Sequence, residues 1–407
     1  MTKIAPIGTS TVLQPHRRVL ELDGLRALAA LNLILFHLTL VYANKYGFES
    51  PLGFTWPFGI YGTQLFFILS GYVNSMSLLR RRRPVDFVAA RLIRIVPMFV
   101  VVVLANLLIL RLAPVDRVVS WGELAANLTL MPKVFGYECV DPVMWTLQIE
   151  MLFYGLLVTL FATGFCTGES TRRNLIGWGV VLAASLTMCR GLDGLSGTSG
   201  DAGWVAAATS IRHLLILDHA PLFAIGYFIY MIRTAVGPRW VNVAGIVAAA
   251  GVFHAIDHGK HNPAATVLIV ALVGAAAYGR VPPLRVRPLM YLSTISYALY
   301  LTHNNLGCVV IERMQRLNAP PWMAVGVAIL FGWAMAEILT HRVEGPMTRR
   351  LRRWWEDRRS DPRSGADRSG RSGSTDPNAS GPLPADSGLA GPPLSSPPAT
   401  PVMPAVG

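Results

Sequence analysis

The sequence has few charged residues for its length. Only 14% of its 407 residues are Asp, Glu, Lys or Arg, whereas 52% are hydrophobic. A soluble protein carries about 25% charged residues, so the composition argues against an ordinary soluble domain. The mean hydropathy of +0.44 agrees. Apolar runs near the length that crosses a bilayer recur along the chain, so we predict a polytopic membrane protein in contact with lipid.

Cysteine is also scarce. Four cysteines do not form a disulfide framework in a chain of this length, and none occurs in a CxxC pair. We therefore expect no structural zinc site and no metal ligands among the site residues. Cys139 and Cys189 both fall near outer ends of predicted spans, which leaves a disulfide between them open.

Acidic residues are outnumbered, with 23 Asp and Glu against 36 Lys and Arg and a net charge of +13. Such an excess can mark nucleic-acid binding, but here the arginines form clusters between apolar segments. This pattern sets the orientation of a membrane protein. We therefore expect no nucleic-acid partner and predict that both termini are cytoplasmic. The clusters are Arg80–Arg83, Arg172 with Arg173, Arg233 with Arg239, Arg280 to Arg287, and Arg349 to Arg353.

Hydropathy predicts an all-α membrane bundle of about ten transmembrane helices. An even number of spans agrees with two cytoplasmic termini. The first twenty residues contain no apolar core, so we expect no cleavable signal peptide and a first span that directs insertion. The predicted spans lie near residues 22–43, 58–79, 87–110, 144–165, 174–190, 210–232, 240–256, 263–279, 288–310 and 321–341.

The composition divides the chain into four predicted parts. Residues 1–20 form a cytoplasmic N-terminal segment, and residues 21–345 form the transmembrane domain. Residues 346–359 form a basic cytoplasmic juxtamembrane segment. Residues 360–407 are rich in Pro, Ser and Gly and have too little apolar surface to fold, which predicts a disordered tail.

The first span keeps two ionisable residues, Arg26 and His37. Eleven residues of α-helix bring the chain back to nearly the same face, about 16 Å further along. We therefore expect Arg26 near the cytoplasmic entrance and His37 beyond the middle of the membrane, facing a common interior. The structural alternatives are an interfacial Arg26 paired with Asp23 and a hydrogen-bonded core histidine at His37.

Other ionisable residues fall at the level predicted for His37. They are Glu150 in "MWTLQIEMLFY" and His303 in "ISYALYLTH", with Asp218 and His219 as further candidates. Any one of them could be structural. Several at one depth indicate a buried polar site.

A second layer of polar residues is predicted at the cytoplasmic entrance. "RLIRIVP" brings Arg91 and Arg94 to the level of Arg26, and guanidinium forks suit phosphate groups. Anchoring at the membrane interface is the alternative for both arginines. In "FFILSGY", Gly71 is best read as a close-packing residue, while Ser70 is either part of that packing or a cavity-lining hydroxyl.

These motifs together resemble the integral-membrane acyltransferase-3 family. The resemblance rests on "LDGLRALAALNLILFH", "FFILSGY", "RLIRIVP", "MWTLQIEMLFY", "ISYALYLTH" and "VEGP", which occur in the family's order over roughly residues 20–350. It implies about ten helices and the transfer of an acyl group from cytoplasmic acyl-CoA to a hydroxyl. The acceptors it implies are surface polysaccharides, peptidoglycan, glycolipids or macrolide-type metabolites.

The resemblance also implies residue roles. Arg26 and His37 become the expected functional pair, Glu150 the acidic residue after the tryptophan, and His303 the late histidine. Ala27 stands where the family often has glycine.

Residues and resemblance combine into one hypothesis, an O-acyltransferase of the cytoplasmic membrane. Acyl-CoA, with acetyl-CoA as the first candidate, would be a substrate rather than a permanently bound cofactor. Arg26, Arg91, Arg94 and Ser70 would form the donor side. His37 would act as general base, with Glu150 or His303 orienting it. The acceptor would be a glycan, glycolipid or macrolide-type hydroxyl.

Two other classes stay open from the sequence. One is a membrane transporter or flippase that uses the buried histidines as a proton relay. The other is a non-catalytic membrane scaffold. The transporter predicts repeat symmetry among the helices, and the scaffold predicts that replacing the buried ionisable residues changes only the stability.

Overall fold

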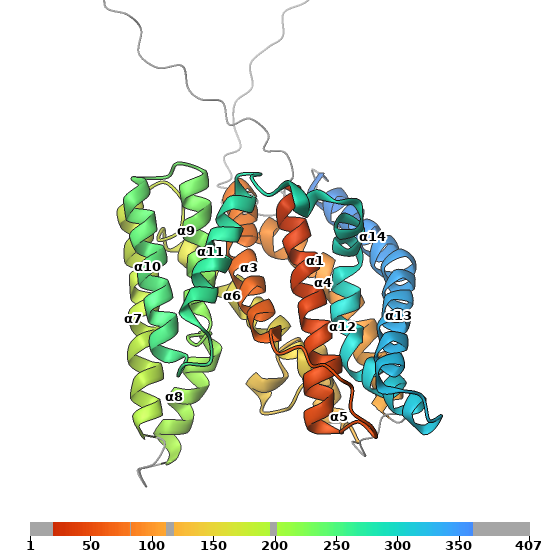
Figure 1. Ribbon diagram of the computed structural model, residues 1–407. Helices are drawn as coiled ribbons and strands as arrows, with labels where there is room; N and C mark the ends of the chain where they lie inside the picture. The colour runs from red at the N-terminus through yellow and green to blue at the C-terminus, as the bar shows by residue number, and fades with distance from the viewer. Residues whose placement is uncertain (1–18, 82, 111–117, 196–201, 361–407) are drawn as a thin grey trace, which may run out of the picture. The chain divides into compact units, whose positions relative to one another are not determined.

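The computed structural model describes residues 19–81, 83–110, 118–195 and 202–360 (Figure 1). All regular structure in these ranges is helical, which confirms the predicted all-α class. Most of the predicted N-terminal segment 1–20, Arg82, and the predicted tail 360–407 beyond its first residue lie outside the described residues. The chain divides into two compact units, and every residue of the sites discussed below belongs to the first, which ends at Trp355.

The helices follow one another with short connections. In chain order they are α1 (Leu20–Phe36), the π-helical η1 (His37–Val41), α2 (Tyr42–Lys45), α3 (Gly59–Arg81), α4 (Pro84–Leu110), α5 (Trp121–Leu128), η2 (Pro132–Phe135), η3 (Pro142–Met144), α6 (Trp145–Ala162), α7 (Thr171–Leu195), α8 (Ala202–Leu214), α9 (Ala220–Arg233), α10 (Arg239–Ile256), α11 (Pro263–Ala277), η4 (Pro282–Arg285), α12 (Arg287–Arg316), α13 (Pro321–Leu339), the π-helical η5 (Thr340–Glu344) and α14 (Gly345–Ser360).

Six helical stretches in the described part of the chain are long and apolar enough to cross a membrane. This agrees with a polytopic helical membrane protein, while the number of ten spans and the side of each terminus stay predictions. The helices α9 and α11 are apolar but shorter. The six stretches are Leu20–Lys45, Pro84–Leu110, Pro142–Ala162, Thr171–Gly194, Arg239–Ile256 and Pro321–Arg359.

Two long helices are more polar because they lie inside the bundle. The helix α3 packs against α1, α9, α11, α4 and α6, and α12 packs against α1, α4 and α13. Their polar side chains therefore face other helices instead of lipid. Gln64 and Asn74 of α3, and Thr302 and His303 of α12, are all less than 9% exposed. A polar interior helix of this kind is where a membrane enzyme can hold its chemistry.

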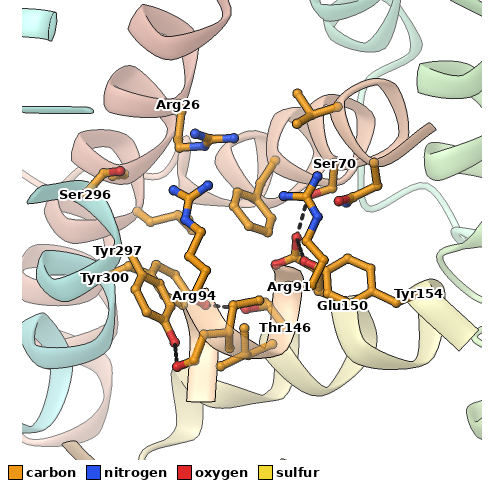
Figure 2. Close-up of a pocket in the computed structure, with 17 residues that line it drawn as sticks. Arg26, Ser70, Arg91, Arg94, Thr146, Glu150, Tyr154, Ser296, Tyr297 and Tyr300 are labelled. Atoms are coloured by element: carbon orange, nitrogen blue, oxygen red, sulfur yellow. Dashed lines mark hydrogen bonds between the residues drawn. The ribbon is translucent and has the colours of Figure 1, made fainter. Parts of the chain in front are cut away.

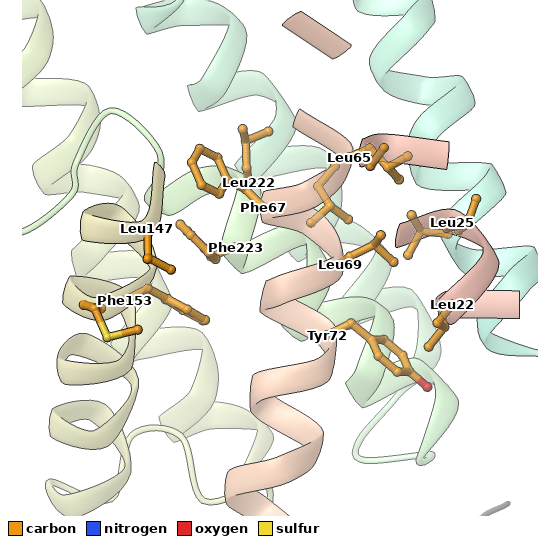
Figure 3. Close-up of a cluster of buried hydrophobic side chains, with 14 of the residues drawn as sticks. Leu22, Leu25, Leu65, Phe67, Leu69, Tyr72, Leu147, Phe153, Leu222 and Phe223 are labelled. Atoms are coloured by element: carbon orange, nitrogen blue, oxygen red, sulfur yellow. The ribbon is translucent and has the colours of Figure 1, made fainter. Parts of the chain in front are cut away.

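Small residues bring α3 and α9 into close contact. A Cβ atom on Gly71 would lie 2.2 Å from the Phe223 carbonyl oxygen, and one on Gly226 would lie 2.0 Å from the Ile68 oxygen. Only glycine fits at both positions, which supports the packing role predicted for Gly71. Figure 3 shows the apolar cluster at this contact, where Phe153 of α6 stacks on Phe223 with ring centroids 4.0 Å apart.

The predicted span 210–232 is wrong as a single helix. The helix α8 ends at Leu214 and α9 begins at Ala220, with Ile216 at a positive φ of 52° between them. Pro221 explains the restart, because proline has no N–H for an incoming helix and is favoured in the first turn of a new one. Asp218 and His219 therefore lie in a break and not within a continuous span.

Candidate active site

A cavity among α1, α3, α4, α6 and α12 collects the residues predicted for the donor side (Figure 2). We call it the arginine cavity; its empty volume, including open solvent at its entrance, is about 810 Å³. The four residues predicted for the donor side, Arg26, Ser70, Arg91 and Arg94, meet here together with Glu150, and their role in binding a donor stays a prediction. The polar side chains that line it are Arg26, Ser70, Asn74, Arg91, Arg94, Thr146, Glu150, Tyr154, Ser296, Tyr297 and Tyr300.

The three arginines enter the cavity from two helices. Arg26 of α1 lies 3.8 Å from the Asp23 carboxylate one turn earlier. The Arg91 guanidinium of α4 lies over the rings of Phe87 and Tyr154, 5.5 and 5.9 Å from their centroids. The buried Arg91 Nε has no hydrogen-bond partner among the described residues. The guanidinium groups of Arg26 and Arg94 face the same space in Figure 2. Such a group of cations can bind an anion with several oxygens.

Glu150 belongs to this cavity and not to the surroundings of His37. Its Oε1 accepts hydrogen bonds from the Ser70 hydroxyl at 3.2 Å and from the Tyr154 hydroxyl at 2.7 Å. The prediction placed Glu150 at the depth of His37 from helix ends that were uncertain by several residues. In the structure its partners come from α3 and from its own helix, so Glu150 is placed to balance the arginines. His303 is the predicted residue that contacts His37.

A second cavity, the basic mouth, adjoins the first and shares Arg26, Arg94 and Val73 with it. Its three other arginines, Arg80, Arg349 and Arg352, were interpreted from the sequence as interfacial or juxtamembrane charges. Only the fold shows that they line one space with Arg26 and Arg94. The polar side chains lining the mouth are Asp23, Arg26, Arg80, Arg94, Ser293, Thr294, Thr340, His341, Glu344, Thr348, Arg349 and Arg352.

His37 and His303 form a hydrogen-bonded pair. His37 Nδ1 lies 3.0 Å from His303 Nε2, and His303 Nδ1 lies 2.7 Å from the Tyr300 carbonyl oxygen. A carbonyl only accepts, so His303 Nδ1 carries a proton and, in the neutral ring, Nε2 is the acceptor. His37 therefore donates through Nδ1, and its Nε2 keeps a free lone pair. This tautomer is the one that a general base requires.

The local backbone at His37 departs from an ordinary α-helix. His37 is the first residue of η1, a π-helical turn inside the first long helix. Such turns are rare and occur frequently at functional sites, because they redirect side chains within a helix. No signal in the sequence predicts the π-helical turn.

The histidine pair opens toward a separate space, the histidine pocket. His37, Trp145 and Asn304 line it, whereas His303 is only 2% exposed. Its empty volume, including open solvent, is about 980 Å³. Its polar and aromatic lining is His37, Tyr42, Lys45, Tyr46, Lys133, Glu138, Trp145 and Asn304.

Tyr300 lies between the arginine cavity and the histidine pocket. Its hydroxyl donates to the Val143 carbonyl at 2.6 Å and lies 2.5 Å from the Thr146 hydroxyl oxygen. Its ring is parallel to that of Phe66, with centroids 6.4 Å apart. Tyr300 and Thr146 line the arginine cavity, while Val143 lines the histidine pocket. We call this contact the partition, since it separates the two spaces in this conformation.

Asp141 is a site residue that sequence reasoning missed. It is 0% exposed, and its carboxylate accepts hydrogen bonds from Asn304 Nδ2 at 2.9 Å, the Asn305 amide at 3.1 Å and the Val143 amide at 3.2 Å. Burial raises its pKa to about 6, against these three N–H groups, which favour the ionised form. Asp141 ties the loop before α6 to the residues that follow His303. An Asp directly before a proline was the available signal, since it is typical of a helix cap.

The remaining candidates lie elsewhere. Asp218 accepts a hydrogen bond from Arg212 Nε at 2.9 Å, and the His219 ring lies 5.3 Å from the Trp145 ring. None of the four cysteines is part of a disulfide, so the bond left open between Cys139 and Cys189 is not present in the structure. The described part of the chain contains no cluster of three or more His, Cys, Asp or Glu side chains that could hold a metal ion.

The fold and the site together describe a helical membrane protein whose interior holds a group of arginines in one cavity and a hydrogen-bonded histidine pair beside another. Comparison with known proteins names the class. The pattern of the acyltransferase-3 family, described as an acyltransferase domain, matches residues 19–336. The chain belongs to this family, as the motifs predicted, and is a membrane-bound O-acyltransferase.

Individual relatives share about a quarter of their aligned residues with this chain. The chain is 25% identical to "Putative membrane-bound transacylase BcsY" of Komagataeibacter xylinus, over 81% of this chain and 84% of that protein. It is 25% identical to "O-acetyltransferase OatA" of Staphylococcus aureus, over 81% of this chain and 57% of that protein. It is 23% identical to "Putative peptidoglycan O-acetyltransferase YrhL" of Bacillus subtilis, over 82% of this chain and 55% of that protein. The chain thus spans little more than half of the last two proteins. No solved structure matches the chain.

Proposed function

We propose that this protein transfers an acetyl group from acetyl-CoA, bound at the basic mouth and arginine cavity, to a glycan hydroxyl activated by His37. The observation that carries the proposal is the arrangement of the arginines. Six of them line two joined cavities, and Tyr300, which lines the inner one, donates a hydrogen bond to Val143 of the histidine pocket, which His37 also lines. The six arginines are Arg26, Arg80, Arg91, Arg94, Arg349 and Arg352.

The charge distribution suits coenzyme A. The coenzyme carries a diphosphate and a 3′-phosphate, and arginine forks bind phosphate oxygens in pairs. In the basic mouth five arginines line the same space as two carboxylates, those of Asp23 and Glu344. The narrower arginine cavity continues toward α6 and Tyr300. Phosphates would bind in the mouth, and the pantetheine arm would extend along the cavity.

The reach of the donor agrees with the spacing of Arg26 and His37. Eleven residues of helix separate the two by about 16 Å along the axis, which is within the length of an extended pantetheine arm. The thioester would then arrive at Tyr300. The partition must open for the thioester to meet His37, which requires the Tyr300 hydroxyl to leave Val143 and Thr146.

His37 would act as the base in the transfer step. Its Nε2 takes the proton of the acceptor hydroxyl while the oxygen attacks the thioester carbonyl. The C–S bond then breaks, and the departing thiolate of CoA takes up the proton from the imidazolium. His303 holds the His37 ring in the required tautomer through its Nε2. This is a base with an orienting partner, an arrangement that is common in acyl transfer.

The acceptor is proposed from the relatives. Their names include O-acetyltransferases and, for the Bacillus protein, peptidoglycan, which supports acetyl as the proposed acyl group and a glycan as the proposed acceptor. The histidine pocket lies beyond Tyr300 from the arginines, which suits an acceptor that arrives from the opposite side of the membrane. With the arginine-rich end in the cytoplasm, both termini would be cytoplasmic and the acetyl ester would form on the outer side of the cytoplasmic membrane.

The experiment that tests the proposal uses purified protein in lipid vesicles or nanodiscs together with acetyl-CoA carrying an isotopic label in the acetyl group. Mass spectrometry is applied to the products of this reaction and, separately, to glycans from cells expressing the wild type or His37→Ala. With the wild type only, we expect a labelled acetyl ester and stoichiometric release of CoA from the purified protein, and an alkali-labile acetyl ester on the glycans from cells. An ester that forms equally with His37→Ala would refute the base assignment. A wild type that neither binds acetyl-CoA nor releases CoA would refute the donor.

A further inference from the structure

A fourth space, the outer pocket, lies among α3, α6, α8, α9, α10 and the loops that precede α6, α9 and α11. It has an empty volume, including its opening, of about 1860 Å³, the largest of the spaces described here. No step of the transfer described above uses it. Its polar and aromatic lining is Thr63, Gln64, Phe67, Lys133, Trp145, Gln148, Ser210, Arg212, His213, Asp218, His219, Phe253, Asp257, His258, Lys260 and His261.

The outer pocket adjoins the histidine pocket. Trp145 and Lys133 line both spaces. Trp145 is the first residue of α6, and Thr146, the next residue, contacts Tyr300 at the partition. A molecule bound in the outer pocket would thus be separated from His37 by the indole of Trp145.

Aromatic rings form one wall of the outer pocket. The His219 ring packs against two of them, 5.3 Å from Trp145 and 5.1 Å from Phe67, at interplanar angles of 42° and 46°. No hydrogen bond within the described residues holds the His219 ring nitrogens. The break between α8 and α9 is what brings this histidine to the wall. The face of a single ring such as the Trp145 indole, with polar groups beside it, suits the apolar face of a sugar ring.

Two amide side chains on the lining keep unused hydrogen-bonding atoms. Gln64 is 1% exposed and donates to the Thr266 hydroxyl at 2.6 Å, while its Oε1 has no partner within the described residues. Gln148 is 5% exposed and accepts from the Lys133 amide at 3.1 Å, which leaves its NH₂ group available. A buried polar atom without a partner, such as Gln64 Oε1, is costly, and a ligand hydroxyl can both donate to an amide oxygen and accept from an amide NH₂ group.

The charged side chains in and around the outer pocket are largely paired with one another. Arg212 makes ion pairs with Asp218 and, at 2.8 Å, with Asp193. His258 bonds to Asp193 at 2.9 Å, and His261 bonds to Asp257 at 2.7 Å. The outer pocket therefore differs from the basic mouth, where arginines exceed carboxylates. It favours a ligand that is neutral and rich in hydroxyl groups over a polyphosphate.

We propose that the outer pocket binds the acceptor glycan, with Gln148 and His219 on hydroxyl or acetamido groups of one sugar and Trp145 against its ring. This inference rests on the proposed function and adds to it the place where the acceptor is held. One sugar would lie against Trp145, and the next would extend past the indole, so that its hydroxyl enters the histidine pocket. Gln148 and His219 are positioning residues in this arrangement, not catalytic ones.

The test measures binding without turnover. The purified full chain in nanodiscs is titrated with two soluble probes, the β-1,4-linked tetramers of N-acetylglucosamine and of glucose. Saturation-transfer NMR reports contact of each tetramer with the protein. The variants are Gln148→Leu and His219→Phe, which keep size and remove hydrogen bonds. We expect at least one tetramer to bind the wild type and each variant to weaken that binding about tenfold, as loss of one hydrogen bond of about 1.4 kcal/mol does.

Two controls keep the result interpretable. Trp322 of α13 is 64% exposed and outside the cavities described above, so Trp322→Ala should bind the tetramers as the wild type does. Thermal unfolding of each variant shows whether the fold is kept. Failure of both tetramers to bind the wild type, or equal binding by wild type and variants, would overturn the acceptor site. Acetyl-CoA binding, measured in parallel, fails only if the proposed donor is wrong.

Discussion

The arginine cavity and the histidine pair show how differently one bundle can hold charge and hydrogen bonds. The arginines keep N–H groups that are not fully used in hydrogen bonds. The Arg91 Nε has no partner in the described chain, and Arg26 makes a 3.8 Å contact with Asp23. The histidines form a directed chain from His37 through His303 to the Tyr300 carbonyl. The first arrangement suits the binding of a ligand that brings its own negative charge. The second suits chemistry, because each proton has a defined position.

The largest effect should follow from loss of the base. We expect His37→Ala to lower the turnover number by about 10² to 10⁴ and to leave the affinity for acetyl-CoA nearly unchanged, since His37 lines the histidine pocket and not the arginine cavity. Turnover and equilibrium binding of acetyl-CoA, measured on the same preparation, check this. An equal loss of both would erase the distinction between the two regions.

Replacing an arginine should produce the opposite pattern. We expect Arg94→Ala to raise the KM for acetyl-CoA about 10- to 100-fold, because a charge-assisted hydrogen bond contributes about 1.5–3 kcal/mol. The turnover number at saturating donor should change much less. Arg239→Ala is the matched control, since Arg239 begins α10 and is exposed outside the cavities described above. A KM effect of the same size in Arg239→Ala would mean that general surface charge, and not the cavity, attracts the donor.

A change at the partition should affect both the arginine cavity and the histidine pocket. Tyr300→Phe removes hydrogen bonds to Val143 and Thr146 but keeps the ring that lies parallel to Phe66. We expect a loss of about 1 kcal/mol in the free energy of unfolding. We also expect acetyl-CoA hydrolysis without acceptor to rise several-fold, because water can then pass between the spaces. CoA release in the absence of glycan measures this rise, and a rate equal to that of the wild type would contradict a separating role.

The smallest effect is expected at Glu150. The change Glu150→Gln keeps an oxygen that can accept from Ser70 and Tyr154 and removes only the charge. We expect the turnover number to fall less than about threefold and the KM for acetyl-CoA to change modestly, since the carboxylate faces the arginines. Steady-state kinetics with both substrates decides this. A loss as large as that of His37→Ala would show that Glu150 acts on the base after all.

The sequence predicted much of the donor side because its signals are local. Arg26, Arg91 and Arg94 stand out within apolar segments, and their depth follows from helix geometry over a few turns. The neighbours of Glu150 carried no such signal. The predicted span begins at residue 144 and α6 begins at Trp145, so the start of the helix was nearly right. The hydrogen bond that joins Glu150 to Ser70 depends on how α6 packs against α3, which the sequence of α6 does not specify.

Other parts of the site had no local signal. The α8–α9 break was hidden because residues 210–232 read as one apolar run, although Pro221 marked the restart. Asp141 carried no prediction, and Arg349 and Arg352 looked like juxtamembrane charges. Each gains its place in the site from contacts with residues more than a hundred positions away, or from a cavity that such contacts enclose.

The sequence by itself determined that this is a helical membrane protein, that it belongs to an acyltransferase family, and that arginines and histidines lie within its spans. These properties follow from composition, from the 3.6-residue period and from motifs, all of which are local or additive along the chain. The tertiary structure decided which of those residues share a space. It joined His37 to His303 across 266 positions and separated both from Glu150. It also placed Tyr300 where a residue of the arginine cavity contacts Val143 of the histidine pocket. The reason is physical: helix rotation, the π-helical turn at His37 and close glycine contacts are set by packing between helices, and a single helix carries no record of its neighbours.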